Sequence, residues 1–94
     1  MSAANAERIV RMRVLLTAAL APVALDVRDD SHKHIGHAGA RDGRGHFSVD
    51  IVSDVFIGMA PLARHRAIYT ALDTMMVTDI HALAILARTS SEAH

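Results

Sequence analysis

Phe47-Ser48-Val49-Asp50-Ile51 is the stretch of this chain that decides its fold. Its three apolar side chains alternate with two polar ones, and a period of two residues is typical of a β-strand with one face on a core. We expect this strand to run on to about Val55. A short connection follows, marked by Gly58 and Pro61.

A second alternating stretch lies upstream. Val23, Leu25 and Val27 alternate with small or charged residues, which predicts another strand with one apolar face. The polar segment between the two strands holds four of the five glycines, and at this length it is typical of a functional loop rather than a hairpin turn. With His46, which follows at once, it forms a histidine-containing loop over residues 29–46.

The amino-terminal segment predicts a helix that is ended by Pro22. Apolar residues recur there at helical spacing, at Ile9, Met12, Leu16 and Leu20. Arginines before an apolar run, and the small residues of Ala19-Leu20-Ala21, would also fit a secretory signal. The acidic Glu7 within the charged part and Pro22 directly after the supposed cleavage site favour the helix.

The carboxyl-terminal half predicts a helix and then a strand. Residues 62–77 form one helix or a split pair, with Ile68 and Met75 at the edge of its apolar stripe. The predicted stripe itself comprises Leu62, His65, Tyr69, Leu72 and Met76. Residues 80–87 are apolar on both faces, as expected of a strand that is covered on both sides or lies centrally.

The predicted order is helix-strand-strand-helix(-helix)-strand, which belongs to the α/β (α+β) class. The natural solution is a three-stranded mixed sheet with the helices packed on one face. At 94 residues, we expect a single domain over residues 1–94.

Composition excludes several functions. The chain contains seven histidines and no cysteine, so it forms no disulfide and can bind a metal only through imidazole, carboxylate or backbone groups. Ten basic residues balance ten acidic ones, which argues against a strongly basic nucleic-acid surface. No stretch is long and apolar enough to span a bilayer, and a cytoplasmic location follows by default.

Several motifs, in this order, resemble the BolA family over about residues 9–92. The first half carries Leu25-Asp26-Val27-Arg28-Asp29-Asp30-Ser31-His32, Gly45-His46-Phe47-Ser48-Val49 and Ile51-Val52-Ser53. The second half carries Phe56-Ile57-Gly58, Leu62-Ala63-Arg64-His65-Arg66-Ala67-Ile68-Tyr69 and Ile80-His81-Ala82-Leu83. The carboxyl end departs from the family pattern, because it lacks the Thr-Pro and Trp often found there.

The resemblance implies a fold like the class II KH domain and a role beside monothiol glutaredoxins. In that pairing the two proteins share a [2Fe–2S] cluster, to which the glutaredoxin cysteine and glutathione supply sulfur and the BolA-like chain supplies histidine. No cluster is held by the isolated chain. Some bacterial members are described instead as DNA-binding regulators of stress response and cell morphology.

His81 is the first candidate metal ligand, because it opens the last strand and matches the family's carboxyl-terminal ligand. The second ligand is expected from the loop, where alignment from Ser31 selects His34 and alignment from His46 selects His37. His32 is expected to be a solvated loop residue, and His46 a packing residue at the start of its strand.

Three residues of the predicted helix remain to be placed. Arg64 and Arg66 flank the apolar stripe and are candidate contacts for a partner, glutathione or phosphate. His65 lies within the stripe, which favours burial with a hydrogen-bonded ring over chemistry.

The leading hypothesis is a non-enzymatic partner of a monothiol glutaredoxin in iron–sulfur cluster trafficking or iron homeostasis. The alternative is a DNA-binding transcriptional regulator, with Lys33, Arg64 and Arg66 as phosphate contacts. An enzyme is disfavoured because no nucleophile–base arrangement, phosphate loop or carboxylate pair is present. We expect no membrane partner.

Overall fold

The computed structural model describes residues 2–31 and 43–93. Helix α1 (Ala3–Leu20) begins at Ser2, whose side chain accepts a hydrogen bond from the Asn5 backbone amide. It ends at Ala21, which adopts a left-handed conformation with φ 43°, directly before Pro22. Met12, Leu16 and Leu20 are buried as predicted, and Ile9 is half-buried.

The sheet consists of β1 (Ala24–Asp29), β2 (Gly45–Val52) and β3 (Ile80–Arg88), in the order β1-β2-β3. β1 pairs with β2 in antiparallel fashion, whereas β2 and β3 are parallel. The mixed, three-stranded sheet confirms the predicted architecture. Val23 lies just outside β1 and is 69% exposed, so it does not share the apolar face of Val27.

β2, and not β3, is the central strand, so the prediction for residues 80–87 is wrong on this point. β2 is buried along both faces, while β3 lies at one edge with exposed residues along its length. Alanines account for much of the apolar character of β3, and a methyl side chain tolerates exposure at an edge.

Strand β2 also ends earlier than predicted, at Val52 rather than near Val55. The next residue, Ser53, accepts a hydrogen bond from the Val55 amide and begins the 3₁₀ helix η3 (Asp54–Phe56). Val55 is half exposed in this turn instead of continuing the alternation of β2.

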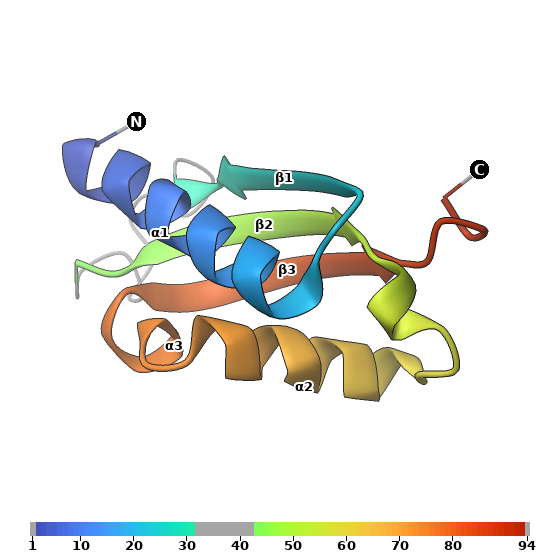
Figure 1. Ribbon diagram of the computed structural model, residues 1–94. Helices are drawn as coiled ribbons and strands as arrows, with labels where there is room; N and C mark the ends of the chain where they lie inside the picture. The colour runs from blue at the N-terminus through green and yellow to red at the C-terminus, as the bar shows by residue number, and fades with distance from the viewer. Residues whose placement is uncertain (1, 32–42, 94) are drawn as a thin grey trace.

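The predicted carboxyl-terminal helix is split into α2 (Pro61–Leu72) and α3 (Met75–Thr78). The break falls at Asp73, whose φ is 52°. The helices lie over one face of the sheet, where α1 passes in front of β2 and β3 and α2 runs alongside β3 (Figure 1). The core between these layers contains Met12, Leu16, Phe47, Val49, Ile51, Phe56, Ile68 and Leu72.

The apolar stripe of α2 is displaced from the predicted one. Ile68 and Met75, expected at its edge, are buried with Leu72, whereas Leu62 and Tyr69 are 60% and 41% exposed. The face of α2 that packs on the sheet contains Arg64, one turn before Ile68. A hydrophobic pattern counts an arginine as exposed, so the pattern placed the buried face elsewhere on the helix. No helix within residues 2–31 and 43–93 is long and apolar enough to cross a membrane.

Candidate metal-ligand site

The histidines His46 and His81 meet at one end of the sheet, where strands β2 and β3 begin. Because β2 and β3 are parallel, both strands begin at this end, and their first residues become neighbours although they are far apart in the sequence. The two ring centroids lie 4.9 Å apart, and the ring planes are tilted by 48°. His46 is 6% exposed, whereas His81 is exposed.

An irregularity in β3 determines which way His81 faces. Gly45 pairs with Ile80 and the next residue, His46, pairs with Ala82, so His81 is an extra residue in β3. Such a bulge re-aims side chains locally. Ile80 is buried and Leu83 packs against the core, while both residues between them are exposed. The bulge therefore directs His81 away from the core at the start of the strand.

Arg44 contacts the ring of His81. Its Nη2 atom lies 3.1 Å from Nδ1 of His81, and its Nη1 atom lies 3.5 Å from the carbonyl oxygen of Val77. Arg44 directly precedes β2, so the guanidinium reaches across from the start of the central strand to the turn that enters β3.

A polar network fixes the backbone at His46. The His46 amide donates to Oγ of Ser31 at 3.0 Å, and its carbonyl oxygen accepts from the Asp30 amide at 2.7 Å. Asn5, buried in α1, donates to Oγ of Ser31 and to Oδ2 of Asp29, both at 3.2 Å. Burial raises the pKa of Asp29, but hydrogen bonds from Ser31 and Asn5 outweigh it, so the net pKa is lowered.

Asp79 anchors the other strand, two residues before His81. Its carboxylate contacts Arg8 at 3.0 Å and Arg11 at 2.8 Å, both from α1. The hydrogen bond from the Thr78 hydroxyl contributes most to lowering the pKa of Asp79, burial opposes it, and the two arginines lower it further. The Asp79 carbonyl accepts from the Gly45 amide at 2.9 Å, which joins the starts of β2 and β3.

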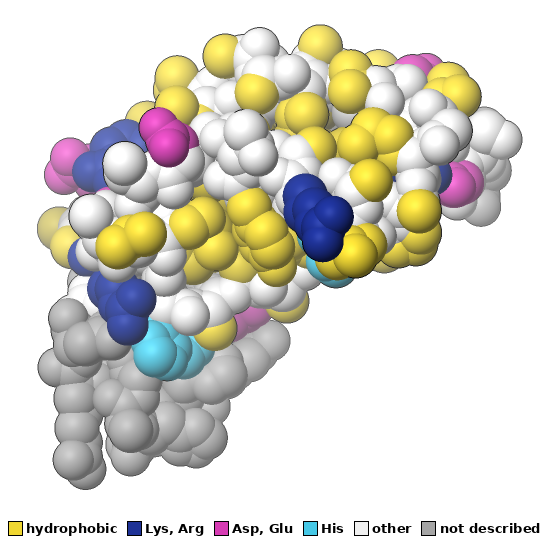
Figure 2. Space-filling model, turned by 90° about the horizontal axis from the view of Figure 1, so that it is seen from below, with side chains coloured by type: hydrophobic (Ala, Val, Ile, Leu, Met, Phe, Trp, Pro, Cys, Tyr) yellow, Lys and Arg dark blue, Asp and Glu magenta, His cyan; other side chains and the backbone are white. Residues whose placement is uncertain are grey.

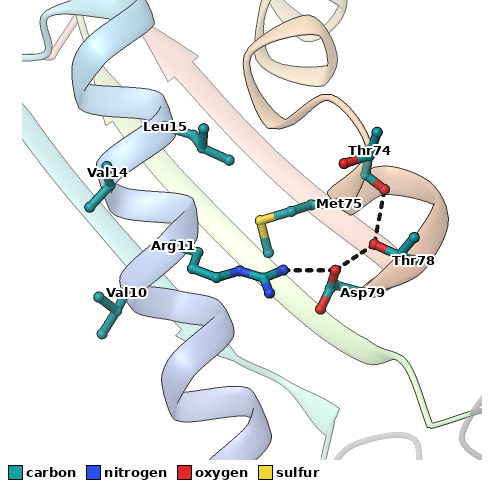
Figure 3. Close-up of a pocket in the computed structure, with 8 residues that line it drawn as sticks. All are labelled: Val10, Arg11, Val14, Leu15, Thr74, Met75, Thr78 and Asp79. Carbon is teal, nitrogen blue, oxygen red and sulfur yellow. Dashed lines mark hydrogen bonds and ion pairs between the residues drawn. The ribbon is translucent and has the colours of Figure 1, made fainter.

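A groove lies between α1 and α3 beside this anchor. It has a volume of about 530 Å³, and its apolar wall includes Val10, Val14 and Met75. Figure 3 shows the Arg11 side chain reaching across the groove to Asp79, while Thr78 bonds both to Asp79 and to the Thr74 carbonyl. Arg11 and Asp79 thus close one side of the groove with an ion pair.

Two of the predicted ligands cannot be placed in this arrangement. His34 and His37 lie outside the described residues, as do His32 and Lys33. Within the described residues, no group of three or more histidine, aspartate or glutamate side chains is arranged to hold a metal ion. His81 offers a single exposed imidazole with no thiolate beside it, since the chain lacks cysteine. This donor fits one histidine position of a metal centre whose other ligands come from elsewhere.

Arg64 is held within the molecule. Its side chain is only 12% exposed, and it donates to the carbonyls of Met59 and Ala87 at 2.9 and 3.1 Å. It also pairs with Glu92 through two nitrogens and lies 5.9 Å from the centroid of the Phe56 ring. These contacts connect α2 to the end of β3 and to the residues after it.

Arg66 and His65 are less enclosed than Arg64. Arg66 is exposed on α2. His65 is half-buried, not buried as predicted, and its ring lies edge-on to Tyr69 at 6.5 Å between centroids. The role of Arg66 as a contact stays a prediction.

Sequence reasoning missed the residues that support the two histidines, namely Arg44, Asp79 and Asn5. One signal was present for Asn5, which falls at the helical spacing of Ile9, Met12 and Leu16. A polar residue on a buried stripe requires hydrogen-bond partners inside the molecule. Arg44 and Asp79 lie next to strand ends, where the pattern alone indicates only polar surface.

The fold and the histidine site define a class of protein. It is a small α/β domain with a mixed three-stranded sheet that presents a histidine at the start of its last strand. The sequence pattern of the family described as BolA-like protein matches residues 16–92. The chain therefore belongs to the BolA-like family, as the sequence motifs indicated.

Known proteins similar to this chain agree with that assignment. The chain is 43% identical to Protein BOLA1, chloroplastic, of Arabidopsis thaliana over 98% of its own length and 59% of that protein's. It is 43% identical to the DNA-binding transcriptional regulator BolA of Escherichia coli over 87% of its length and 75% of that protein's. The chain spans only 24% of SufE-like protein 1 of A. thaliana, to which it is also 43% identical.

The solved structure of the BolA domain of SufE1 from A. thaliana has a similar fold. It superimposes with a TM-score of 0.80 at 42% identity, covering 90% of this chain and 94% of that one. The helix-strand-strand-helix-strand order is thus the order of a BolA structure. The cytoplasmic location stays a prediction, because one similar protein is named as chloroplastic and another is bacterial.

Proposed function

We propose that this chain is a non-enzymatic partner of a monothiol glutaredoxin and that His81 ligates a [2Fe–2S] cluster shared between them. The observation that carries the proposal is the exposed His81 ring at the bulge of β3, held at this end of the sheet by anchored neighbours on both strands. When bound, such a cluster supplies electron transfer and a transferable iron–sulfur unit. The glutaredoxin cysteine and glutathione would provide the thiolates that this chain lacks.

The anchors on both strands support a ligand role for His81. A metal-binding side chain has to be held in one orientation, and groups around the ligand usually provide that restraint. Here the buried ring of His46 lies against His81, and the Gly45–Asp79 backbone bond fixes the start of β3. His81 is the one ligand that we propose from the described residues, and the second is expected from His34 or His37 in the loop that leads into β2.

An exposed apolar surface beside α2 and β3 suits a protein partner. Leu62, Tyr69, Val77 and Leu86 are all at least 41% exposed. Apolar side chains gather across the middle of the face on which α2 lies (Figure 2). Exposed apolar side chains of this kind are typical of protein interfaces, and the exposed Arg66 on α2 offers a charged contact for the partner or for glutathione.

The test is anaerobic reconstitution of the full chain with a monothiol glutaredoxin, glutathione, iron and sulfide, followed by visible absorption and circular dichroism. We expect a heterodimer whose spectrum differs from that of glutaredoxin alone. His81→Ala should abolish or strongly alter this spectrum, whereas His65→Ala on α2 serves as the matched histidine control and should preserve it. A wild-type spectrum in His81→Ala would eliminate the ligand assignment.

The loop ligand is resolved by the same assay. His34→Ala and His37→Ala are compared side by side, and we expect one of them to alter the cluster spectrum while the other leaves it unchanged. If neither variant changes the spectrum, the second ligand is neither His34 nor His37.

A second candidate function is DNA-binding regulation. The similarity to the E. coli protein named DNA-binding transcriptional regulator BolA favours it. The available basic surface is limited, because Arg64 is bonded within the molecule and the chain has no net charge. Sequence-selective binding that persists at moderate salt and weakens in Arg66→Ala would support this function, while weak binding that disappears with salt would not.

A further inference from the structure

The contact between Arg44 and His81 has a chemical consequence for the imidazole. A guanidinium carries only donors, so the His81 nitrogen that it contacts must accept. Arg44 Nη2 lies 3.1 Å from Nδ1 of His81. The neutral ring beside Arg44 therefore carries its proton on Nε2.

This tautomer opposes metal binding through either ring nitrogen. A metal on Nδ1 would occupy the position of the guanidinium. A metal on Nε2 requires the proton to move to Nδ1, because a neutral ligating imidazole keeps one N–H. That N–H would then face another donor at hydrogen-bond distance. Along both routes, the contact between Arg44 and His81 has to break.

We propose that Arg44 is a positioning residue that sets the tautomer of His81 and competes with metal for it. The second Arg44 contact, to the Val77 carbonyl, holds the guanidinium over the turn between α3 and β3 in the free chain. His81 becomes a ligand only when Arg44 moves away. The competition with metal rests on the proposed ligand role of His81, whereas the tautomer assignment rests on the contact alone.

The tautomer is measured directly by long-range ¹H–¹⁵N spectra of the histidine rings in the full chain near pH 8. We expect the His81 ring of the wild-type protein to be protonated at Nε2. In Arg44→Ala the ring should become a mixture of both tautomers, while Arg44→Lys, which retains a donor, should keep part of the preference. A wild-type ring protonated at Nδ1, or a tautomer unchanged in Arg44→Ala, would overturn the proposal.

The competition is measured with Zn²⁺ alone, followed at the His81 ring nitrogens so that the other histidines do not contribute to the readout. We expect Arg44→Ala to bind Zn²⁺ at His81 about two- to tenfold more tightly, the range that corresponds to the net free energy of one hydrogen bond. Arg28→Ala is the matched control, because it also removes one arginine, here from an exposed position of β1.

Each result separates the two proposals. Equal Zn²⁺ affinity of His81 in Arg44→Ala and Arg28→Ala would show that only net charge matters and would overturn the competition. Failure of the glutaredoxin reconstitution would instead remove the proposed function, and the ring spectra would still report whether Arg44 sets the tautomer. Amide spectra of each variant establish that the fold is retained.

Discussion

The hydroxyl of Ser53 is fully buried and connects three elements of the fold. It donates to the carbonyl of Leu20 at the end of α1 and accepts from the Val55 amide at 3.2 Å. Helix ends leave carbonyls without partners inside the helix, and Ser53 satisfies one of them. The same side chain ends β2 and begins η3.

We expect Ser53→Ala to lower the free energy of unfolding by about 1–3 kcal/mol, because the buried Leu20 carbonyl and the Val55 amide both lose their partner. Urea denaturation at neutral pH measures the change. Ser91→Ala, at an exposed position after β3, is the control and should stay within about 0.5 kcal/mol of the wild type. A Ser53→Ala variant as stable as this control would contradict the prediction.

Arg64 illustrates what the sequence pattern cannot show about single residues. The motif Arg64-His65-Arg66 presents two identical charges, one on each side of a helical stripe. One of them is bonded to two carbonyls and Glu92, and the other is exposed. Partners from the other end of the chain decide this difference, and a local pattern does not contain them.

Among the helices, the end of α1 is the position where the sequence conflicts most clearly with the backbone. Pro22 correctly predicted where the helix stops. The residue that adopts the left-handed conformation there is Ala21, which donates its amide to the Thr17 carbonyl at 3.1 Å. A left-handed residue with a Cβ atom is strained, and glycine is the usual residue at this position.

Ala21→Gly should therefore stabilise the protein by about 0.5–1 kcal/mol, the relief of strain less the larger entropy loss of glycine. Thermal and urea unfolding both measure this gain. Ala18→Gly, within the exposed side of the same helix, should instead destabilise by a similar amount. Destabilisation by Ala21→Gly would show that the cap does not have the left-handed geometry.

Periodicity predicted the α-helices and strands of the described residues, but not the 3₁₀ helix η3 or all of the element limits. The alternation in β2 and the stripe of α1 are strong signals because their apolar residues all face one core. The stripe of residues 62–77 was misplaced because the face of α2 that packs on the sheet includes Arg64, which a hydrophobic pattern counts as exposed. The bulge at His81 is likewise invisible in the sequence, since it arises from pairing with β2.

At the scale of the whole molecule, the carboxyl-terminal residues are tied to α2 through Glu92. Glu92 pairs with Arg64 and accepts from the Thr89 amide at 2.8 Å. The hydrogen bonds from Arg64, and then from Thr89, lower the pKa of Glu92 from 4.5 to about 2. The unfolded chain therefore binds this proton at a higher pH than the folded one, and stability rises with pH across that interval.

We expect Glu92→Gln to be less stable than the wild type at pH 7, and the difference to shrink as the pH falls from about 4.5 to 2. Urea unfolding at several pH values measures the free energy of unfolding of both proteins as a function of pH. Glu7→Gln, at an exposed position of α1, is the control that removes one carboxylate while leaving the Glu92–Arg64 pair in place. A constant difference between Glu92→Gln and the wild type over this range would exclude the ion pair as the cause.

The arrangement of the strands is the part of the fold that local patterns could not determine. Strand β3 has the more apolar sequence, yet β2 is the central strand and pairs with both β1 and β3. Which strands pair depends on contacts between distant segments. The resemblance to the BolA family implied a KH-like fold, but the sequence analysis assigned no strand order from it, and the supporting contacts of Arg44 and Asp79 came only from the structure.

The parallel pairing of β2 and β3 also bears on when the site forms during folding. Helices α2 and α3 must cross over before the two strands can align, and contacts between distant segments close slowly because the chain loses loop entropy first. We expect the β2–β3 pairing, and with it the approach of His46 to His81, to form after the transition state of folding. An interaction that forms after the transition state stabilises mainly by slowing unfolding. A ligand at this end of the sheet is therefore expected to lengthen the lifetime of the native state while leaving the rate of folding unchanged.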